Sequence, residues 1–491
     1  MQNKQPSLWL SILPIAILVG LLALTISIFG SDALGGGSQV SLLIAACVCV
    51  AIGMGILNKP WQDFEEAMIR NISGVGTAII ILLIIGALSG AWVVSGVVPT
   101  LIYYGIQIIH PDFFLLCTCI ICAIVSVMTG SSWTTIATIG IALMGIGKAQ
   151  GFDEGWIAGA IISGAYFGDK VSPLSDTTVL ASSTTSTPLF THIRYMMYTT
   201  VPSLVLALII FGVAGLSHEA GDTSHIALFT EALDSKFCIT PWLLIVPVVT
   251  GILIAKRVPS IITLFISTLL AIVFAAILQP QLLTEIAGSA NGWVDGVKGA
   301  FMTLFGPTAL DAGNIEVNDL IATRGMAGMM DTIWLIICAM CFGGAMTAGG
   351  MIEGITRLLT RFTHRRTSMV GSTVASGLFF NIATADQYIS IILTGNMFKD
   401  IYERNGYESR LLSRTTEDAV TVTSVLIPWN TCGMTQATIL GVATLTYLPY
   451  CFFNIISPLM SILVAWTGYK IHRKNSNFGL STQYRNKDRI V

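Results

Sequence analysis

Ionisable residues in apolar surroundings mark the part of this chain that could do chemistry. Asp169, Lys170 and Asp176 lie in one apolar stretch, and Asp386 lies in another. An ionisable side chain inside a bilayer costs roughly 2.5 to 3.5 kcal/mol on insertion scales, so each needs a structural or functional reason. Polar side chains accompany them, and the candidates for substrate binding are Ser131, Ser132, Lys170, Ser172, Pro173, Ser175, Thr177, Gln387, Asn430 and Thr431.

Carboxylate, hydroxyl and amide oxygens are the ligands that a small hard cation such as sodium prefers. We therefore predict that Asp169, Asp176 and Asp386 bind cations or protons, with Asp176 as the first choice for the exchanging residue. Competition between sodium and a proton for one desolvated aspartate is sufficient for exchange. The predicted sodium ligands are Asp176, Ser175, Asn430 and Thr431.

Structural roles are the alternatives for the same charged residues. Asp176 could cap the helix that follows it, and Asp386 could cap the second arm of a hairpin. Lys170 could extend its ammonium group to the membrane surface. Glu417 and Asp418 are expected near the inner surface as solvated charges, with a cytoplasmic gate as the alternative.

The composition indicates that these residues belong to a membrane protein. Of 491 residues, 54% are hydrophobic and only 11% are charged, and the mean hydropathy is +0.77. A soluble domain carries about 25% charged residues, so we predict an all-α polytopic membrane protein. The net charge of −2 argues against nucleic-acid binding. Without a nucleotide-binding loop, the energy for transport would come from an ion gradient, and neither a cofactor nor enzymatic activity is expected.

Runs of about 20 apolar residues predict membrane-spanning helices. Residues 112–148 and 366–398 are interrupted near the middle and predict re-entrant hairpins. Residues 155–183 and 415–442 are interrupted at Pro173 and Pro428 and predict broken helices. The simple spans are 8–30, 38–57, 76–98, 193–216, 237–255, 258–279, 332–351 and 447–468. This layout gives ten crossings and places most Lys and Arg residues on the side of both termini, which is therefore the predicted cytoplasmic side.

The two halves of the chain match each other at one constant offset. Thr129 matches Thr384, Trp133 matches Tyr388 and Pro173 matches Pro428. Each half has five crossings, an odd number, so the second half is predicted to be inverted. The predicted boundaries are 1–220 for the first repeat, 221–468 for the second and 469–491 for a polar cytoplasmic tail. Inverted repeats with discontinuous helices are typical of secondary transporters.

The run from Gly164 to Thr178, GAYFGDKVSPLSDTT, closely resembles the signature of the NhaC-type sodium/proton antiporter family. Residues 384–388 and 424–433 look like the second-half motifs of that family. The resemblance implies the two-hairpin, inverted-repeat fold of the wider ion transporter superfamily, which commonly forms homodimers. It also implies export of sodium in exchange for protons across a bacterial inner membrane. The site positions that it carries over are Asp169, Ser172, Pro173, Ser175, Asp176, Thr177, Asp386, Asn430 and Thr431.

Two functions remain open, because the same family contains malate/lactate exchangers and members proposed to carry amino acids. The first is sodium/proton exchange by alternating access, with the lipid bilayer, sodium and protons as partners. The alternative is a sodium- or proton-coupled carrier of a small carboxylate or amino acid. Lys170 and the positively polarised N-termini of the half-helices would favour an organic anion.

Overall fold

The computed structural model describes residues 6–29, 35–217, 223–256, 258–288, 292–360 and 365–471. This part of the chain is built from helices and contains no β-strand, so the prediction of an all-α fold is confirmed. Seven of its helices are long and apolar enough to cross a membrane, or up to nine if each bent pair is one span. The polytopic class is therefore confirmed, whereas the count of ten crossings stays a prediction. Residues 472–491 of the predicted tail lie outside the described residues.

The elements of the predicted first repeat are α1 (Leu8–Phe29), α2 (Gly37–Gly55), α3 (Trp61–Gly74), α4 (Gly76–Val94), α5 (Val97–Ile108), α6 (Phe114–Thr129), α7 (Ser132–Thr135), α8 (Ile141–Ala149), α9 (Glu154–Val171), α10 (Asp176–Thr184) and α11 (Leu189–Leu216). Those of the second are α12 (Thr223–Lys236), α13 (Ile245–Ala255), α14 (Ser260–Leu278), α15 (Pro280–Ala287), α16 (Trp293–Phe305), α17 (Ile315–Ile321), α18 (Met330–Ala348), α19 (Met351–Thr360), α20 (Arg366–Thr384), α21 (Gln387–Arg404), α22 (Ser409–Thr416), α23 (Thr431–Leu440), α24 (Thr444–Tyr447) and α25 (Phe452–Thr467).

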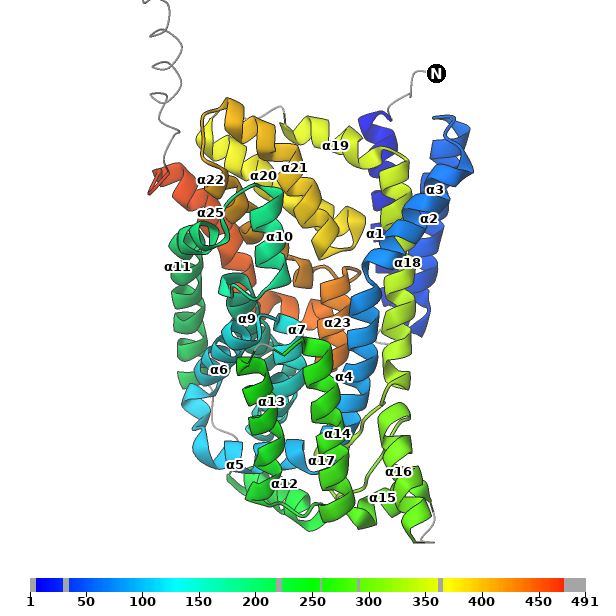
Figure 1. Cartoon of the computed structure of the whole chain (residues 1–491), viewed down its shortest axis with the longest axis vertical. Coiled ribbons are helices and arrows are strands. Elements are labelled where there is room, and N and C mark those ends of the chain that lie inside the picture. The colour runs from blue at the N-terminus through cyan, green and yellow to red at the C-terminus, as the bar shows by residue number, and fades with distance from the viewer. Residues whose placement is uncertain are drawn as a thin grey trace, which may run out of the picture.

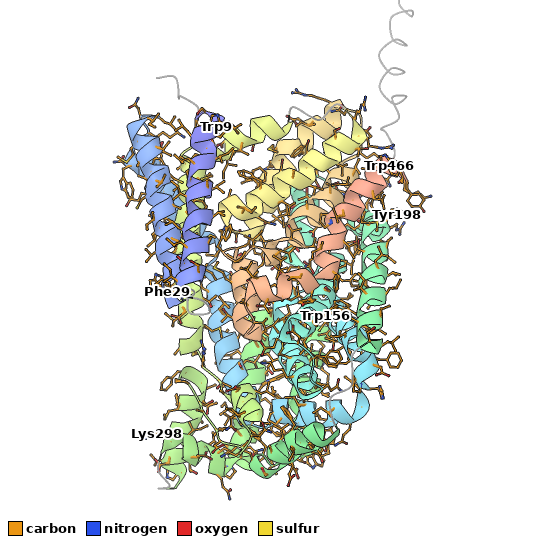
Figure 2. The ribbon with its side chains drawn as sticks, turned by 180° about the vertical axis from the view of Figure 1, so that it is seen from behind. Trp9, Phe29, Trp156, Tyr198, Lys298 and Trp466 are labelled. Carbon is orange, nitrogen blue, oxygen red and sulfur yellow. The ribbon has the colours of Figure 1, made fainter. Side chains whose placement is uncertain are left out.

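The start of α1 and the end of α25 lie at the same end of the molecule (Figure 1). Figure 2 places Trp9 and Trp466 at this end and Lys298 at the opposite end. The two tryptophans are 81% and 70% exposed, as expected for aromatic side chains at a membrane surface. This arrangement agrees with the predicted layout, in which the termini share one side. That this side is cytoplasmic stays a prediction.

One predicted simple span starts at a bend, and another contains one. The region 237–255 contains a short 3₁₀ turn and α13, and Pro241–Ala255 is bent by 89° from Ala227–Lys236. In the region 447–468, Thr444–Tyr450 and Phe452–Thr467 are bent by 56°. Proline lacks an N–H and tends to begin or interrupt a helix, and both bends have one close by, Pro241 and Pro449.

The chain folds back on itself where the first hairpin was predicted. α6 ends at Gly130, which adopts a left-handed φ of 67° that glycine tolerates without strain. The side-chain amide of Gln150 donates a hydrogen bond of 2.8 Å to the carbonyl of Ile109. The two ends of the segment therefore meet. Its placement in a bilayer stays a prediction.

The second predicted hairpin has the same geometry. Ala385 lies between α20 and α21 with a left-handed φ of 58°, and the two helices pack against each other (Figure 1). The hydroxyl groups of Thr373 and Tyr402, one on each arm, are 3.0 Å apart. Ala385 is the sequence match of Gly130, so the same reversal occurs at equivalent positions of the two halves.

Both predicted breaks have an extended residue directly before a proline, although in the second half the regular helix already ends at Thr416 and gives way to the π-helical turn Glu417–Thr421 and the 3₁₀ turn Ser424–Leu426. Ser172 ends α9 in an extended conformation before Pro173, and Ile427 adopts an extended conformation before Pro428. A residue that precedes proline is disfavoured in the helical region, so Ser172–Pro173 stops α9 and Ile427–Pro428 stops the 3₁₀ turn Ser424–Leu426. Beyond the breaks, α10 packs against α21, and α23 packs against the π-helical turn Ile136–Gly140 and α8. Each broken helix thus contacts the hairpin of the other half.

Close packing of α6 on α9 holds the first hairpin against the first broken helix. A Cβ atom on Gly164 would overlap the backbone carbonyl oxygen of Cys119. We expect Gly164→Ala to lower the free energy of unfolding in detergent by about 1–3 kcal/mol through overpacking. The matched control is Gly251→Ala, where the added methyl group meets no atom within 4 Å. Equal stability of the two variants in a denaturant titration would contradict this account of the α6–α9 contact.

Candidate ion-binding site

Asp169 lies in the last turn of α9, where the tip of the first hairpin meets the break in the helix. Its side chain is 6% exposed and its carboxylate accepts three hydrogen bonds. The backbone N–H and the hydroxyl of Ser132 donate to Oδ2 at 3.2 and 2.7 Å, and the hydroxyl of Ser175 donates to Oδ1 at 2.6 Å. The hydroxyl of Thr177 lies 2.9 Å from that of Ser175. The structure therefore brings four predicted site residues together.

Asp386 forms the corresponding centre in the second half. It is 2% exposed and caps α21, since its Oδ1 accepts the backbone N–H of Ile389 at 2.9 Å. The structure thus confirms the capping alternative for this residue. The other oxygen, Oδ2, accepts the hydroxyl of Thr431 at 3.2 Å. The Asn430 side-chain oxygen accepts the backbone N–H of Cys432 at 3.1 Å, so Asn430 caps α23.

Hydrogen bonds at the two centres recur at the offset that relates the two halves of the sequence. Ser132 donates to Asp169, and at the matching positions Ser424 donates to Gln387 at 2.8 Å. The further matched pairs are Ser126–Ala165 with Asn381–Val420 and Ser131–Thr134 with Asp386–Ile389. The duplication seen in the sequence therefore extends to side-chain contacts. The inverted orientation of the second half stays a prediction.

Tyr388, next to the tip of the second predicted hairpin, lies near both centres. Its hydroxyl lies within electrostatic range of Asp169, Asp176 and Asp386, which are the three predicted cation-binding residues. Since Asp169 and Asp176 come from the first half and Asp386 from the second, the cation-binding candidates of both halves gather in one region of the molecule.

A family model described as the Na+/H+ antiporter family matches residues 2–185 and 164–469, which together cover nearly the whole chain. The chain belongs to the Na+/H+ antiporter family. It is 37% identical over 434 residues to a protein named Na(+)/H(+) antiporter NhaC from Alkalihalophilus pseudofirmus, covering 88% of this chain and 91% of that one. The sequence-based assignment to the NhaC-type family is confirmed, and the chain is a transporter and not an enzyme.

Two further relatives have names that include organic substrates. The Malate-2H(+)/Na(+)-lactate antiporter of Bacillus subtilis is 35% identical over 442 residues, covering 89% of this chain and 91% of that one. The Arginine/ornithine antiporter ArcD of Halobacterium salinarum is 34% identical over 484 residues, covering 96% and 94%. The chain is about equally identical to antiporters that are named for different substrates. Sequence identity therefore does not assign its substrate, which has to be inferred from the residues of its own site.

Asp176 differs from Asp169 in its surroundings. It is the first residue of α10, and the N-cap is Ser175, whose hydroxyl accepts the backbone N–H of Thr178. The alternative that Asp176 caps this helix is therefore wrong. Asp176 and Pro173 are both exposed in the antiporter. Ser172 is engaged elsewhere, since its hydroxyl donates a hydrogen bond of 2.9 Å to the backbone carbonyl of Val127. The geometry of the described residues favours Asp169 as the central carboxylate.

The four predicted sodium ligands fall into two groups. Ser175 and Asp176 lie at the Asp169 centre, whereas Asn430 and Thr431 lie at the Asp386 centre. Within the described chain, no hydrogen bond joins one pair to the other. Each pair lies beside its own carboxylate, and a single sodium ion held by all four residues stays a prediction.

Lys170 is buried and paired, so the alternative that it reaches the membrane surface is wrong. Its ammonium group forms an ion pair with Asp418 and donates a hydrogen bond of 3.0 Å to the hydroxyl of Ser457. Lys170 and Asp418 are both 0% exposed. Although Lys170 follows Asp169 in the chain, its partner comes from the second half of the antiporter.

Glu417 and Asp418 are fully buried, so their expected position as solvated charges is also wrong. Both belong to the π-helical turn Glu417–Thr421, which follows α22 directly, and Arg414 in the last turn of α22 is buried as well. The spacing of residues 414, 417 and 418 places three charges on one helix face, and this was the signal that could have indicated an internal cluster. For Ser424 the signal was the repeat itself, because Ser424 matches Asp169.

Proposed function

We propose that this chain exchanges sodium for protons across the bacterial inner membrane by alternating access. The observation that carries the proposal is the buried Asp169 carboxylate, surrounded by the hydroxyls of Ser132, Ser175 and Thr177 where a hairpin tip meets a broken helix. Carboxylate and hydroxyl oxygens together suit a small hard cation. Family membership and the relatives named sodium/proton antiporters agree with this function.

The hydroxyl groups at Asp169 can serve both the empty and the loaded state. Without sodium they donate hydrogen bonds to the carboxylate, as in the structure. A hydroxyl also has two acceptor lone pairs and rotates freely, so Ser132 and Ser175 can turn their oxygens towards a bound cation. A proton on Asp169 would remove the charge that attracts sodium. Competition between the two cations for one carboxylate would then couple their movements.

Alternating access would involve the contacts between the two halves. The first broken helix packs on the second hairpin, and the second broken helix packs on the first hairpin. Together with the matched hydrogen bonds, this exchange of contacts supports the proposed inverted repeats 1–220 and 221–468, which would rock about the aspartates. We place both termini in the cytoplasm and include a homodimer in the proposal.

The test is exchange in inside-out membrane vesicles with an acidic interior. If the proposal holds, sodium alone added outside dissipates the pH gradient, which a pH-sensitive dye reports. Lithium and potassium, tested side by side, define the cation selectivity. A pH gradient unaffected by sodium, in vesicles shown to contain the protein, would refute sodium/proton exchange.

A second candidate is coupled transport of a small carboxylate or amino acid, and the relatives whose names include malate, lactate, arginine and ornithine favour it. The half-helix N-termini at Ser175 and Asn430 remain suited to a carboxylate. Lys170 no longer supports it, because Asp418 already holds the ammonium group. This function predicts accumulation of a labelled solute when a sodium gradient is imposed. If none of a panel of carboxylates and amino acids is taken up, this second function is refuted.

Asp386 offers a test that separates cation binding from helix capping. Serine caps helices about as well as aspartate, and Ser131 has this role at the matching position in the first half. We expect Asp386→Ser to keep the stability of α21 but to slow sodium/proton exchange at least about tenfold, because a full negative charge is lost. Exchange rates come from the vesicle assay and stability from thermal unfolding in detergent. Wild-type exchange in this variant would leave Asp386 with a capping role alone.

A further inference from the structure

A second buried polar cluster lies beside the Asp169 site, and the proposed exchange at Asp169 does not use it. Lys170, Arg414, Glu417 and Asp418 are each 0% exposed. Lys170 is on α9 of the first half, whereas the other three are on α22 and the following π-helical turn of the second half. Such π-helical turns occur frequently at functional sites.

The buried carboxyl groups in this region differ in the donors that surround them. Asp169 accepts three hydrogen bonds. Asp418 accepts the ammonium group of Lys170 and the hydroxyls of Ser457 and Thr199, the latter two at 2.9 and 3.2 Å. In contrast, Glu417 has only the nearby hydroxyl of Thr421, on its own π-helical turn, to interact with, and neither of its carboxyl oxygens has a hydrogen bond of good geometry among the described residues. A buried carboxylate with so few donors is disfavoured relative to its neutral form.

The two cations near Glu417, Lys170 and Arg414, are directed at other groups, and no ion pair with Glu417 occurs among the described residues. Lys170 is paired with Asp418, and Arg414 has its Nε atom 3.9 Å from Asp418 Oδ2 with its guanidinium group over the Tyr195 ring. The other charged or titratable groups around this turn include Asp169 on α9, the exposed Asp176 on α10, Tyr402 on α21 and the buried His192 on α11, whose ring nitrogen lies 2.8 Å from the hydroxyl of Ser413. The single ionisable residue of α20, Arg366, donates to carbonyl groups at the end of α25, which has none of its own.

We propose that Glu417 carries a second proton through the transport cycle, in addition to the proton that competes with sodium at Asp169. The inference rests on the proposed sodium/proton exchange and extends it to the number of protons moved. Glu417 lies on a turn of the second half that packs against α9 and α10 of the first half. Movement of one half against the other would change the access of water to this carboxyl group.

The charge balance of the cycle follows directly. A proton from water on the outer side binds a carboxylate oxygen of Glu417, and the same proton returns to water on the inner side. A second proton replaces sodium at Asp169 and takes the same route. Each cycle then moves two protons inward and one sodium ion outward. One net positive charge enters the cell, so exchange is driven by the membrane potential as well as by the pH gradient.

The test compares wild type with Glu417→Gln in proteoliposomes whose membrane potential is set by potassium and valinomycin. Glutamine has the shape of protonated glutamate, so the variant is expected to fold as wild type does. We expect sodium flux in wild type to reverse at a potential that depends on the imposed gradients. In Glu417→Gln, exchange through Asp169 continues, the proton-to-sodium ratio falls by one and the flux no longer responds to potential. Glu417→Asp restores the response.

Glu408→Gln is the matched control, because Glu408 is partly exposed and paired with Arg410. It should keep the wild-type response to potential. Three results would overturn the inference: a wild type whose exchange ignores the potential, a Glu417→Gln variant that keeps the wild-type ratio, or a Glu417→Gln variant that fails to fold. The last would mean that Glu417 is ionised and structural. Absence of sodium/proton exchange in wild type would instead refute the proposed function.

Discussion

Replacement of Asp169 with asparagine is expected to abolish sodium-dependent proton movement while the protein stays folded. Two unit charges about 4 Å apart interact with about 4 kcal/mol at an effective dielectric constant near 20. Loss of the negative charge should therefore weaken sodium binding about 1,000-fold. The measurement is the rate at which added sodium dissipates the pH gradient in inside-out vesicles.

The local hydrogen bonds explain why Asp169→Asn should fold. The backbone N–H of Ser132 needs an acceptor, which the amide oxygen of asparagine supplies at the position of Oδ2. The amide NH₂ then faces Ser175, whose hydroxyl can rotate to accept it. Asp319→Asn, at an exposed position on α17, is the control and should exchange normally. Sodium/proton exchange at the wild-type rate in Asp169→Asn would remove this carboxylate from the mechanism.

Replacement of Lys170 with methionine is expected to produce the largest loss of stability among these variants. Removal of one partner from a buried ion pair leaves the other charge uncompensated, which typically costs about 3–5 kcal/mol. Asp418 would be left with the hydroxyls of Ser457 and Thr199. We expect a decrease of this size in the free energy of unfolding, measured by denaturant titration in detergent.

The double variant Lys170→Met/Asp418→Asn should recover most of the lost stability, because neither buried charge then remains unpaired. The exposed pair Lys236–Glu285, with a distance of 2.9 Å and Glu285 47% exposed, provides the comparison. Lys236→Met should cost less than about 1 kcal/mol. A double variant as unstable as Lys170→Met would show that the lysine stabilises the fold through some contact other than Asp418.

Local sequence predicted where the helices break and where the chain reverses, because the causes are local; that the reversals are the tips of re-entrant hairpins stays a prediction. Pro173 and Pro428 lack an N–H and force the preceding residue out of the helix, wherever the segment lies in the fold. Gly130 permits a left-handed reversal, and the repeat places Ala385 at the same point of the second half. The cap by Asp386 is equally local, since its partner is the backbone N–H of Ile389.

The partners of the charged residues were not predictable in this way. Asp176 and Asp169 have similar surroundings in the sequence, but only Asp169 is buried against the hairpin tip. Glu417 and Asp418 lie near the start of an apolar stretch, and from this position we expected them to be exposed to solvent. In the structure both are buried, and residues of α9, α11 and α25 bind Asp418. Which charges are covered depends on helices that are far away in the chain.

The sequence by itself determined that this chain is an all-α, polytopic membrane protein of the Na+/H+ antiporter family, with a helix break and a reversal of the chain in each half. These features follow from composition, apolar run length and residues that act on their own backbone. Only the tertiary structure decided that Asp169 meets Ser132 and that Lys170 is held by Asp418. Both contacts form between segments brought together by helix packing, and a residue's place in the sequence carries no information about a partner supplied by another helix.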